Sequence, residues 1–156
     1  MDNDTNTLAL HVETDFRQMI SQTVQGITFS FKAGEFFQNN AYVLPVMVDK
    51  VISLLTGDDV EYLIDAYCGS GLFSLTSSQH FKATYGVEIS ELAVEAAKQN
   101  ARINNIENSQ FLCAKSEAIF ELPELEQLDK DKTVILLDPP RKGCDELFLN
   151  QLFAFR

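Results

Sequence analysis

The amino-acid sequence predicts an α/β fold in which one parallel sheet carries helices on both faces. Four short and mainly apolar segments, at 62–65, 83–88, 110–113 and 133–138, have the length and composition of buried strands. A segment with helical apolar spacing, 90–104, separates the second of them from the third. Strands that alternate with helices run parallel, and helices cover both faces of the sheet.

The length and charge of the chain limit what it can be. With 156 residues, 46% of them hydrophobic and 22% charged, it has the size of one domain and the composition of a folded protein. No apolar run approaches the roughly 20 residues of a membrane span. The net charge of -11 repels phosphate groups, so we expect weak nucleic-acid binding by these residues. A bound RNA would need basic surface from elsewhere.

The first predicted elements are a strand and a helix. Apolar residues at alternate positions of 26–32 indicate a strand with one buried face. Apolar residues at helical spacing in 41–55 indicate an amphipathic helix, and Pro45 is tolerable there because it falls in the first turn. We therefore expect an N-terminal β element and lead-in to the site at 1–40, and a partial domain of the parallel-sheet type at 41–156.

The remaining elements follow from capping residues and charge. Ser90 is expected to cap the helix that ends near 104–105, because a serine hydroxyl can accept a hydrogen bond from a free backbone amide. The charged stretch 121–132 is interpreted as a solvated helix face and a loop before the fourth strand. A last helix is expected over 145–155.

A glycine-containing loop, Asp65-Ala-Tyr-Cys-Gly-Ser-Gly71, follows the first strand of the predicted sheet. Gly69 and Gly71 have no Cβ, so a nucleotide can approach the backbone in the crevice at the carboxyl ends of the strands. The dinucleotide fingerprint requires a third glycine where Ser74 stands, which disfavours an oxidoreductase. Glu88 ends the second strand, where a carboxylate can accept hydrogen bonds from both hydroxyls of a ribose.

The loop after the fourth strand, Asp138-Pro-Pro-Arg-Lys-Gly143, brings its carboxylate to the same crevice. Together with the glycine loop and Glu88, it resembles the class I S-adenosylmethionine-dependent methyltransferases, whose fold is Rossmann-like. Methyltransferases that act on exocyclic amines have a similar loop with an aromatic residue at the position of Arg141. Amine (N-) methylation with the Asp138 loop is therefore the alternative, and not the first hypothesis.

Five motifs narrow the resemblance over roughly residues 27–150. They look like those of the RNA uracil-5 methyltransferase family, especially its tRNA-modifying members: Phe36-Phe-Gln-Asn-Asn40, Asp65 to Gly71, Gly86-Val-Glu-Ile-Ser90, Asn100-Ala-Arg-Ile-Asn104 and Asp138 to Gly143. The resemblance implies S-adenosyl-L-methionine as the cofactor and an incomplete class I sheet. It implies that the residues that bind this cofactor are Gln38, Tyr67, Glu88 and Asp138, beside Gly69 and Gly71.

The family's chemistry requires two further residues. Carbon 5 of uracil is a weak nucleophile, so a cysteine thiolate first adds to carbon 6, and a base later removes the proton on carbon 5. Family members resemble one another in a cysteine before Asn-Pro and in a later glutamate, and both positions would lie beyond Arg156. We therefore expect a fragment that can bind cofactor, without a catalytic residue or metal of its own, and inactive alone.

The three cysteines have structural interpretations. Cys144 follows two basic residues at the start of a helix, which favours a thiolate, but it matches no family nucleophile and is interpreted as structural. Cys68 is expected to be a small packed residue and Cys113 a strand residue. Such widely spaced thiols fit neither a disulfide framework nor a paired-cysteine metal site.

Three candidate site residues have alternative interpretations as well. Gln38 could instead cap the helix 41–55, because amide side chains often pair with free backbone donors. Tyr67 could be a core aromatic with its hydroxyl at the surface. Glu117 could lie near an adenine, although an exposed carboxylate at a helix start is the more common case.

Location and partners follow from the termini and the resemblance. The acidic start, Met1 to Thr5, lacks the features of a signal or transit peptide, so we expect an intracellular, cytoplasmic protein. The full-length parent is expected to bind tRNA or another RNA. A third hypothesis is a binding module without activity that pairs through the exposed edge of the fourth strand.

Overall fold

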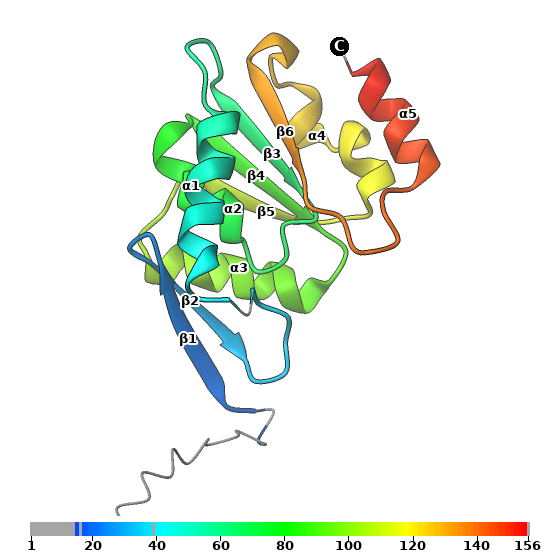
Figure 1. Ribbon diagram of the computed structural model, residues 1–156. Coiled ribbons are helices and arrows are strands. Elements are labelled where there is room, and N and C mark those ends of the chain that lie inside the picture. Colours follow the sequence, from blue (N-terminus) through cyan, green and yellow to red (C-terminus); the bar gives the residue numbers. More distant parts are fainter. Residues whose placement is uncertain (1–14, 16, 39, 156) are drawn as a thin grey trace, which may run out of the picture.

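The central sheet has four parallel strands in the order β5-β4-β3-β6 within the described residues (Figure 1). The computed structural model describes residues 15, 17–38 and 40–155. Tyr62 of the strand β3 pairs with Ala83 on one side and with Thr133 on the other, so β3 is hydrogen-bonded along both edges. The parallel sheet predicted from the sequence is confirmed. Its strands are β3 (Tyr62–Ala66), β4 (Ala83–Glu88), β5 (Ser109–Cys113) and β6 (Thr133–Leu137).

Helices cover both faces of this sheet, as predicted (Figure 1). One face packs against α1 (Val43–Leu55), α2 (Leu72–Ser77) and α3 (Glu91–Ile103). The other face packs against η2 (Ser116–Glu121), α4 (Pro123–Glu126) and α5 (Glu146–Ala154). Two short turns of 3-10 helix, η1 (Ser78–His80) and η3 (Lys130–Lys132), lead into β4 and β6. None of the described helices is long and apolar enough to cross a membrane.

A β-hairpin precedes the sheet. Its strands, β1 (Met19–Val24) and β2 (Ile27–Lys32), are antiparallel, and the turn residues Gln25 and Gly26 both have positive φ, as a two-residue turn of type I′ requires. The sequence predicted only the second strand, because β1 is mostly exposed and does not alternate clearly between apolar and polar residues. Of the proposed segment 1–40, residues 1–14, 16 and 39 lie outside the described residues.

Short polar side chains accept hydrogen bonds from free amides at the starts of α1, α3 and α5. Ser90 Oγ accepts a hydrogen bond from the Ala93 amide at 3.3 Å, which confirms it as the cap of α3. Asn40 Oδ1 accepts from the amides of Tyr42 and Val43 just before α1. The cap of α5 is Asp145, not Cys144, and its carboxylate accepts from Leu147 N at 2.8 Å. The caps at Ser90 and Asp145 fix the starts of the helices that follow β4 and β6.

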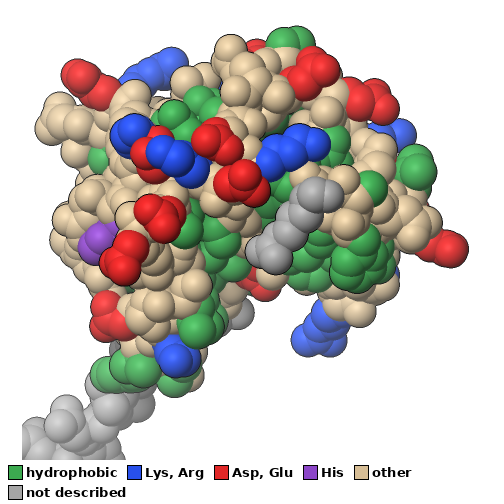
Figure 2. Space-filling view, turned by 90° about the horizontal axis from the view of Figure 1, so that it is seen from above, with side chains coloured by type: hydrophobic (Ala, Val, Ile, Leu, Met, Phe, Trp, Pro, Cys, Tyr) green, Lys and Arg blue, Asp and Glu red, His purple; other side chains and the backbone are tan. Residues whose placement is uncertain are grey.

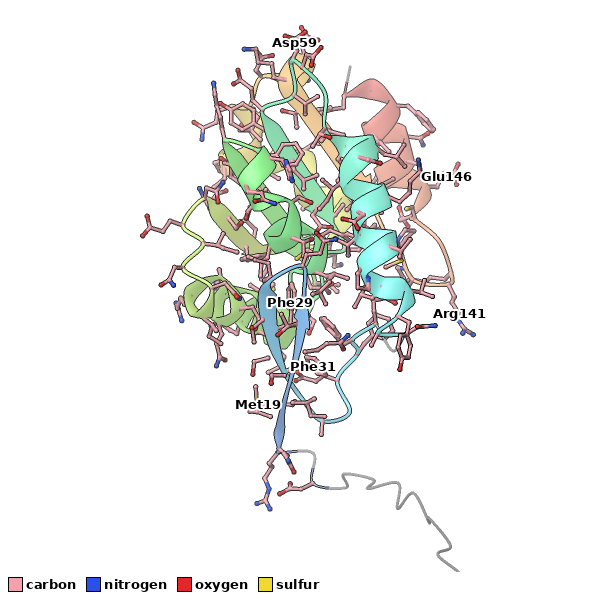
Figure 3. The ribbon with its side chains drawn as sticks, turned by 60° about the vertical axis from the view of Figure 1, so that its left-hand side comes forward. Met19, Phe29, Phe31, Asp59, Arg141 and Glu146 are labelled. Atoms are coloured by element: carbon pink, nitrogen blue, oxygen red, sulfur yellow. The ribbon has the colours of Figure 1, made fainter. Side chains whose placement is uncertain are left out.

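The apolar core lies on the two faces of the sheet. Phe29, Val48 and Leu75 are fully buried on the face of α1 to α3, and Ile119 and Phe148 are fully buried on the other. Burial of this kind is the main term that stabilises the fold. The hairpin shares the first of these cores through Phe29. Figure 3 shows Phe29 on the part of the hairpin nearer the sheet and Met19 at its outer end.

Candidate functional site

A cavity of about 1150 Å³ opens at the carboxyl ends of the strands. Ligands of open α/β sheets bind at this edge, because the loops that follow the strands converge there. Figure 3 labels two of the lining residues, Arg141 on the loop after β6 and Glu146 at the start of α5. The lining comes from five segments of the chain: 36–38, 67–73 without Gly71, 87–89, 114–117 and 138–146.

The glycine loop forms the floor of the cavity with an unusual backbone. Tyr67, Gly69 and Gly71 all have positive φ, at 76°, 53° and 88°. A Cβ at Gly69 would meet no atom within 4 Å, so this backbone is open to a ligand. A Cβ at Gly71 would lie 3.0 Å from Phe111, and Gly71 does not line the cavity. Gly71 therefore packs behind the loop, and the contact with the cofactor predicted for it stays a prediction.

Glu88 holds the glycine loop and still faces the cavity. Its Oε2 accepts from the Gly69 amide at 3.2 Å, and its Oε1 accepts from the Ser90 amide at 2.9 Å. The two bonds fix the orientation of the carboxylate at the end of β4. Each carboxylate oxygen has more than one lone pair, so both can accept a further hydrogen bond from a ligand.

Asp65 lies beneath the loop and is almost fully buried. Its Oδ2 accepts from the amide and the hydroxyl of Ser74, at 3.0 and 2.7 Å, and its Oδ1 has no partner among the described residues. Burial raises the pKa of Asp65 to about 6 against the lowering effect of these hydrogen bonds. Ser74, the residue that breaks the dinucleotide fingerprint, thus has a positive role here: it ties α2 to β3.

One wall of the cavity is formed by Tyr67, Glu117 and Cys144. The Tyr67 ring meets Phe148 edge-on, with centroids 6.0 Å apart, and burial raises the pKa of its phenol. Glu117, which the sequence favoured as an exposed carboxylate, is half-buried and lines this wall. Its position after β5 was the only signal in the sequence. Tyr67 is thus both a packed aromatic and a lining residue.

The opposite wall comes from the segment before α1. Phe37 is buried, and its ring stacks on Phe31 of the hairpin with centroids 4.6 Å apart. Phe36 is 81% exposed at the rim of the cavity. Gln38 is half-buried and lines the cavity; the capping role considered for it belongs to Asn40 instead.

The loop after β6 closes the rim. Asp138 is exposed and lines the cavity directly after the strand, followed by Pro139 and Pro140, which restrict the backbone. Arg141 and Lys142 stand on the same rim. The rim therefore carries both a carboxylate and two cations, although the chain as a whole is acidic.

The cysteines differ in their surroundings. Cys68 is buried, and burial raises the pKa of its thiol well above the usual value, which favours the neutral thiol over the thiolate. Cys113 is exposed at the end of β5, and its Sγ donates to Ile89 O at 3.6 Å. Cys144 is half-buried against the apolar cluster of α5 and lines the cavity. The packed and strand positions predicted for Cys68 and Cys113 are confirmed.

Comparison with known proteins identifies the family. The model of the family described as tRNA (Uracil-5-)-methyltransferase matches residues 5–155. The chain belongs to this family. The uracil-5 methyltransferase resemblance inferred from the sequence motifs is thereby confirmed.

Relatives in this family are much longer than the chain. A tRNA (uracil(54)-C(5))-methyltransferase of Saccharomyces cerevisiae is 46% identical over 95% of the chain, which spans 24% of that relative. The Schizosaccharomyces pombe protein of the same description is 39% identical over 92% of the chain, which spans 28% of it. The chain thus corresponds to about a quarter of these uracil-5 methyltransferases.

A solved structure agrees with the fold. The Pyrococcus abyssi tRNA (uracil-54, C5)-methyltransferase in complex with S-adenosyl-L-homocysteine superposes with a TM-score of 0.71 and 27% identity. The match covers 86% of this chain and 31% of that one. A Methanocaldococcus jannaschii protein, TYW2 in complex with AdoMet, shares the fold at a TM-score of 0.59 and 15% identity. The predicted class I methyltransferase fold, in part, is confirmed.

The tertiary structure brings most of the predicted site residues of this family member together. Gln38, Tyr67, Gly69, Glu88 and Asp138 come from four separate segments and line one cavity. Gly71 lies behind the loop, and Glu117 joins the lining. No group of three or more His, Cys, Asp or Glu side chains within the described residues could hold a metal ion.

Proposed function

We propose that this chain is the cofactor-binding part of an S-adenosylmethionine-dependent tRNA uracil-5 methyltransferase. The observation that carries the proposal is the convergence of Gln38, Tyr67, Gly69, Glu88 and Asp138 on one cavity in a member of this family. Because the chain spans about a quarter of its curated relatives, methylation of uracil and binding of tRNA are proposed for the longer protein.

The donor and acceptor groups of the cavity fit S-adenosylmethionine. Its ribose has two hydroxyl donors, and both oxygens of Glu88 face the cavity with acceptor capacity left. Its sulfonium and ammonium groups are positive, and Asp138 and Glu117 give the lining further negative charge. The open backbone at Gly69 leaves space where a side chain would intrude.

Each lining residue then has a definite task. Glu88 would hold the ribose, and Asp138 and Gln38, which both line the cavity, would hold polar groups of the amino-acid part. The Tyr67 and Phe73 side chains would exclude water from the apolar parts of the ligand. The bound cofactor supplies an electrophilic methyl group. This chain's residues orient it, and the thiolate and base of the family would act from outside these residues.

Binding of S-adenosylhomocysteine to the purified chain tests the proposal. Isothermal titration should give saturable heat for the wild type. Glu88→Gln should weaken binding at least about ten-fold, because one carboxylate acceptor becomes a donor amide. Glu107→Gln, an equal charge change at an exposed position outside the lining, should leave affinity unchanged. No heat from a folded wild-type chain would contradict the proposal.

Product analysis with a longer family member carrying this sequence separates uracil-5 from amine chemistry. Formation of 5-methyluridine in tRNA is expected, whereas methylated adenine, guanine or glutamine amide would favour the amine alternative. The family match supports the first outcome. We propose a cytoplasmic location for the longer protein, where its tRNA substrate is present. We also propose that this acidic chain alone binds RNA weakly and without a metal, and a gel-shift titration with tRNA checks the RNA binding.

A further inference from the structure

Two asparagines of α3 pair with the backbone of the hairpin. Asn104 Oδ1 accepts from the Thr28 amide at 2.8 Å, and its Nδ2 donates to Thr28 O at 2.8 Å. Asn100 Oδ1 accepts from the Ser30 amide, also at 2.8 Å. These side chains therefore take the place of a neighbouring strand along this edge of β2. They are the two ends of the Asn100-Ala-Arg-Ile-Asn104 motif, to which the cofactor cavity assigns no role.

The spacing of the two asparagines on α3 explains why they bond alternate residues of β2. Residues four apart on an α-helix are separated by about 6 Å along its axis. Residues two apart on a strand are separated by about 6.7 Å. Asn100 and Asn104 can therefore meet Ser30 and Thr28 in sequence, with helix and strand running in opposite directions.

Asn100 has a second partner that Asn104 lacks. Its Nδ2 donates to Ser70 O at 3.2 Å, in the middle of the glycine loop. Asn100 is fully buried, and its amide and carbonyl groups are each used once, on different parts of the fold. Asn104 Nδ2 instead donates to Asn100 O within the helix. Of these two asparagines, Asn100 thus joins the hairpin to the floor of the cavity and Asn104 does not.

The hairpin carries this connection to the opposite wall. Phe31, one residue after Ser30, stacks on Phe37, and Phe29 packs against the same ring at 5.5 Å. Phe37 precedes Gln38, a lining residue. Asn100 is therefore linked to the floor directly, through Ser70, and to the wall formed by the segment 36–38 through β2.

We propose that Asn100 is a positioning residue for the cofactor cavity, which sets the glycine loop and the segment 36–38 at a fixed distance from each other through Ser70 O and Ser30 N. Asn104 secures the hairpin only. The inference rests on the proposed function, because that function names the ligand of the cavity. The hydrogen bonds of Asn100, however, are present in the chain without a ligand. The motif from Asn100 to Asn104 thereby gains a role in the geometry of the cavity, although neither asparagine lines the cavity.

Hydrogen exchange of the ligand-free full chain tests the positioning step. Asn100→Asp keeps the acceptor for Ser30 N and loses the donor to Ser70 O, while Asn104→Asp keeps the acceptor for Thr28 N and leaves the loop contact intact. The Gly69 and Gly71 amides, which bond Glu88 Oε2 and Cys68 O, should exchange at least about ten-fold faster in Asn100→Asp. In Asn104→Asp they should stay within about two-fold of the wild type. Equal effects of the two variants would overturn the proposal.

Affinity for S-adenosylhomocysteine provides the second readout. At a temperature where every variant is folded, Asn100→Asp should bind at least about five-fold more weakly than Asn104→Asp. If Asn100→Asp does not fold, Asn100→Ser, which shortens the side chain without adding charge, replaces it with the same expectations. Wild-type chain that fails to bind contradicts the proposed function alone, because the exchange result still decides the role of Asn100. If the wild type binds and the folded Asn100 variant binds with unchanged affinity, the positioning role alone is contradicted.

Discussion

At the amino ends of the strands Glu61 bridges two lysines, Lys82 at 2.6 Å and Lys132 at 2.8 Å, whereas at the carboxyl ends Glu88 is held by backbone amides and has no lysine or arginine partner within the described residues. Figure 2 looks onto the first of these ends and shows acidic and basic side chains next to one another. In Figure 3, Asp59 marks that end and Arg141 the other. The two ends of one sheet thus use the same kind of side chain differently.

This difference indicates that the carboxylate at the amino ends contributes to stability, whereas the carboxylate at the carboxyl ends remains able to bind a ligand. An ion pair uses its charges internally and contributes a modest amount when it is exposed. A carboxylate fixed by amides keeps acceptor capacity for a ligand. The carboxyl end also has the less ordinary backbone, with positive φ at Tyr67 and Gly69, and the buried Asp65 lies beneath it. Such features stabilise the fold less than alternatives would, and they cluster at functional sites.

The largest expected effect concerns Asp65. Burial raises its pKa from 3.8 to about 6, so between these pH values the folded chain holds a proton that the unfolded chain releases. This group therefore lowers the free energy of unfolding as pH rises from 4 to 6, by up to about 3 kcal/mol. Asp65→Asn keeps an oxygen for Ser74 and should remove this fall. Urea unfolding of both proteins at pH 4, 5, 6 and 7 measures the difference.

The exposed Asp59 supplies the control for this experiment. Asp59→Asn makes the same chemical change at the amino end and should leave the pH profile of the wild type unchanged. A profile of Asp65→Asn that parallels that of Asp59→Asn would show that Asp65 is not the group responsible.

Glycine-to-alanine substitutions compare space at the two ends. A Cβ at Gly86 in β4 would lie 2.6 Å from the Phe111 ring and 2.8 Å from Cys68 Sγ, so Gly86→Ala should destabilise the chain by about 2 kcal/mol. A Cβ at Gly57, before β3, would contact only the Val60 side chain, at an ordinary distance of 3.4 Å. Gly57→Ala should therefore change stability little. Thermal unfolding of the two variants decides whether the carboxyl end is the more tightly packed one. Similar melting temperatures would contradict this.

Two carboxylate substitutions should separate the roles of the ends. Glu61→Gln should lower the melting temperature slightly, because both lysines lose their partner, without a change in affinity for S-adenosylhomocysteine. Glu88→Gln should reduce that affinity, because one of the two acceptor oxygens that face the cavity becomes an amide donor. Differential scanning calorimetry and titration on the same samples measure both. A loss of affinity in Glu61→Gln would break the proposed division.

The smallest effect is the acid response of the amino end. Hydrogen bonds from Lys132 and Lys82 lower the pKa of Glu61 from 4.5, so its stabilising contribution is complete above that pH and is lost as pH falls through the lowered pKa. The sign is opposite to that of Asp65. The difference in melting temperature between the wild type and Glu61→Gln should therefore disappear on acidification below pH 4. A difference that persists in acid would indicate another origin for the stabilisation.

The sequence by itself determined the elements whose signals are local. Apolar runs with strand length located β3, β4, β5 and β6, and Ser90 identified the start of α3, because side-chain period and capping depend on neighbouring residues alone. Since parallel strands end at one edge of the sheet, it also followed that Glu88 and Asp138 would share a crevice. The five sequence motifs indicated the uracil-5 methyltransferase family.

Only the tertiary structure decided what depends on distant contacts. Thr28 bonds a side chain 76 residues later, and Ser30 bonds one 70 residues later; no local pattern encodes such pairs. Gly71 packs behind its loop because Phe111, from another strand, occupies that space, and Glu117 joins the lining because η2 turns toward the cavity. Local periodicity fixes which face of an element is apolar, whereas the partners of each polar group depend on how the elements pack.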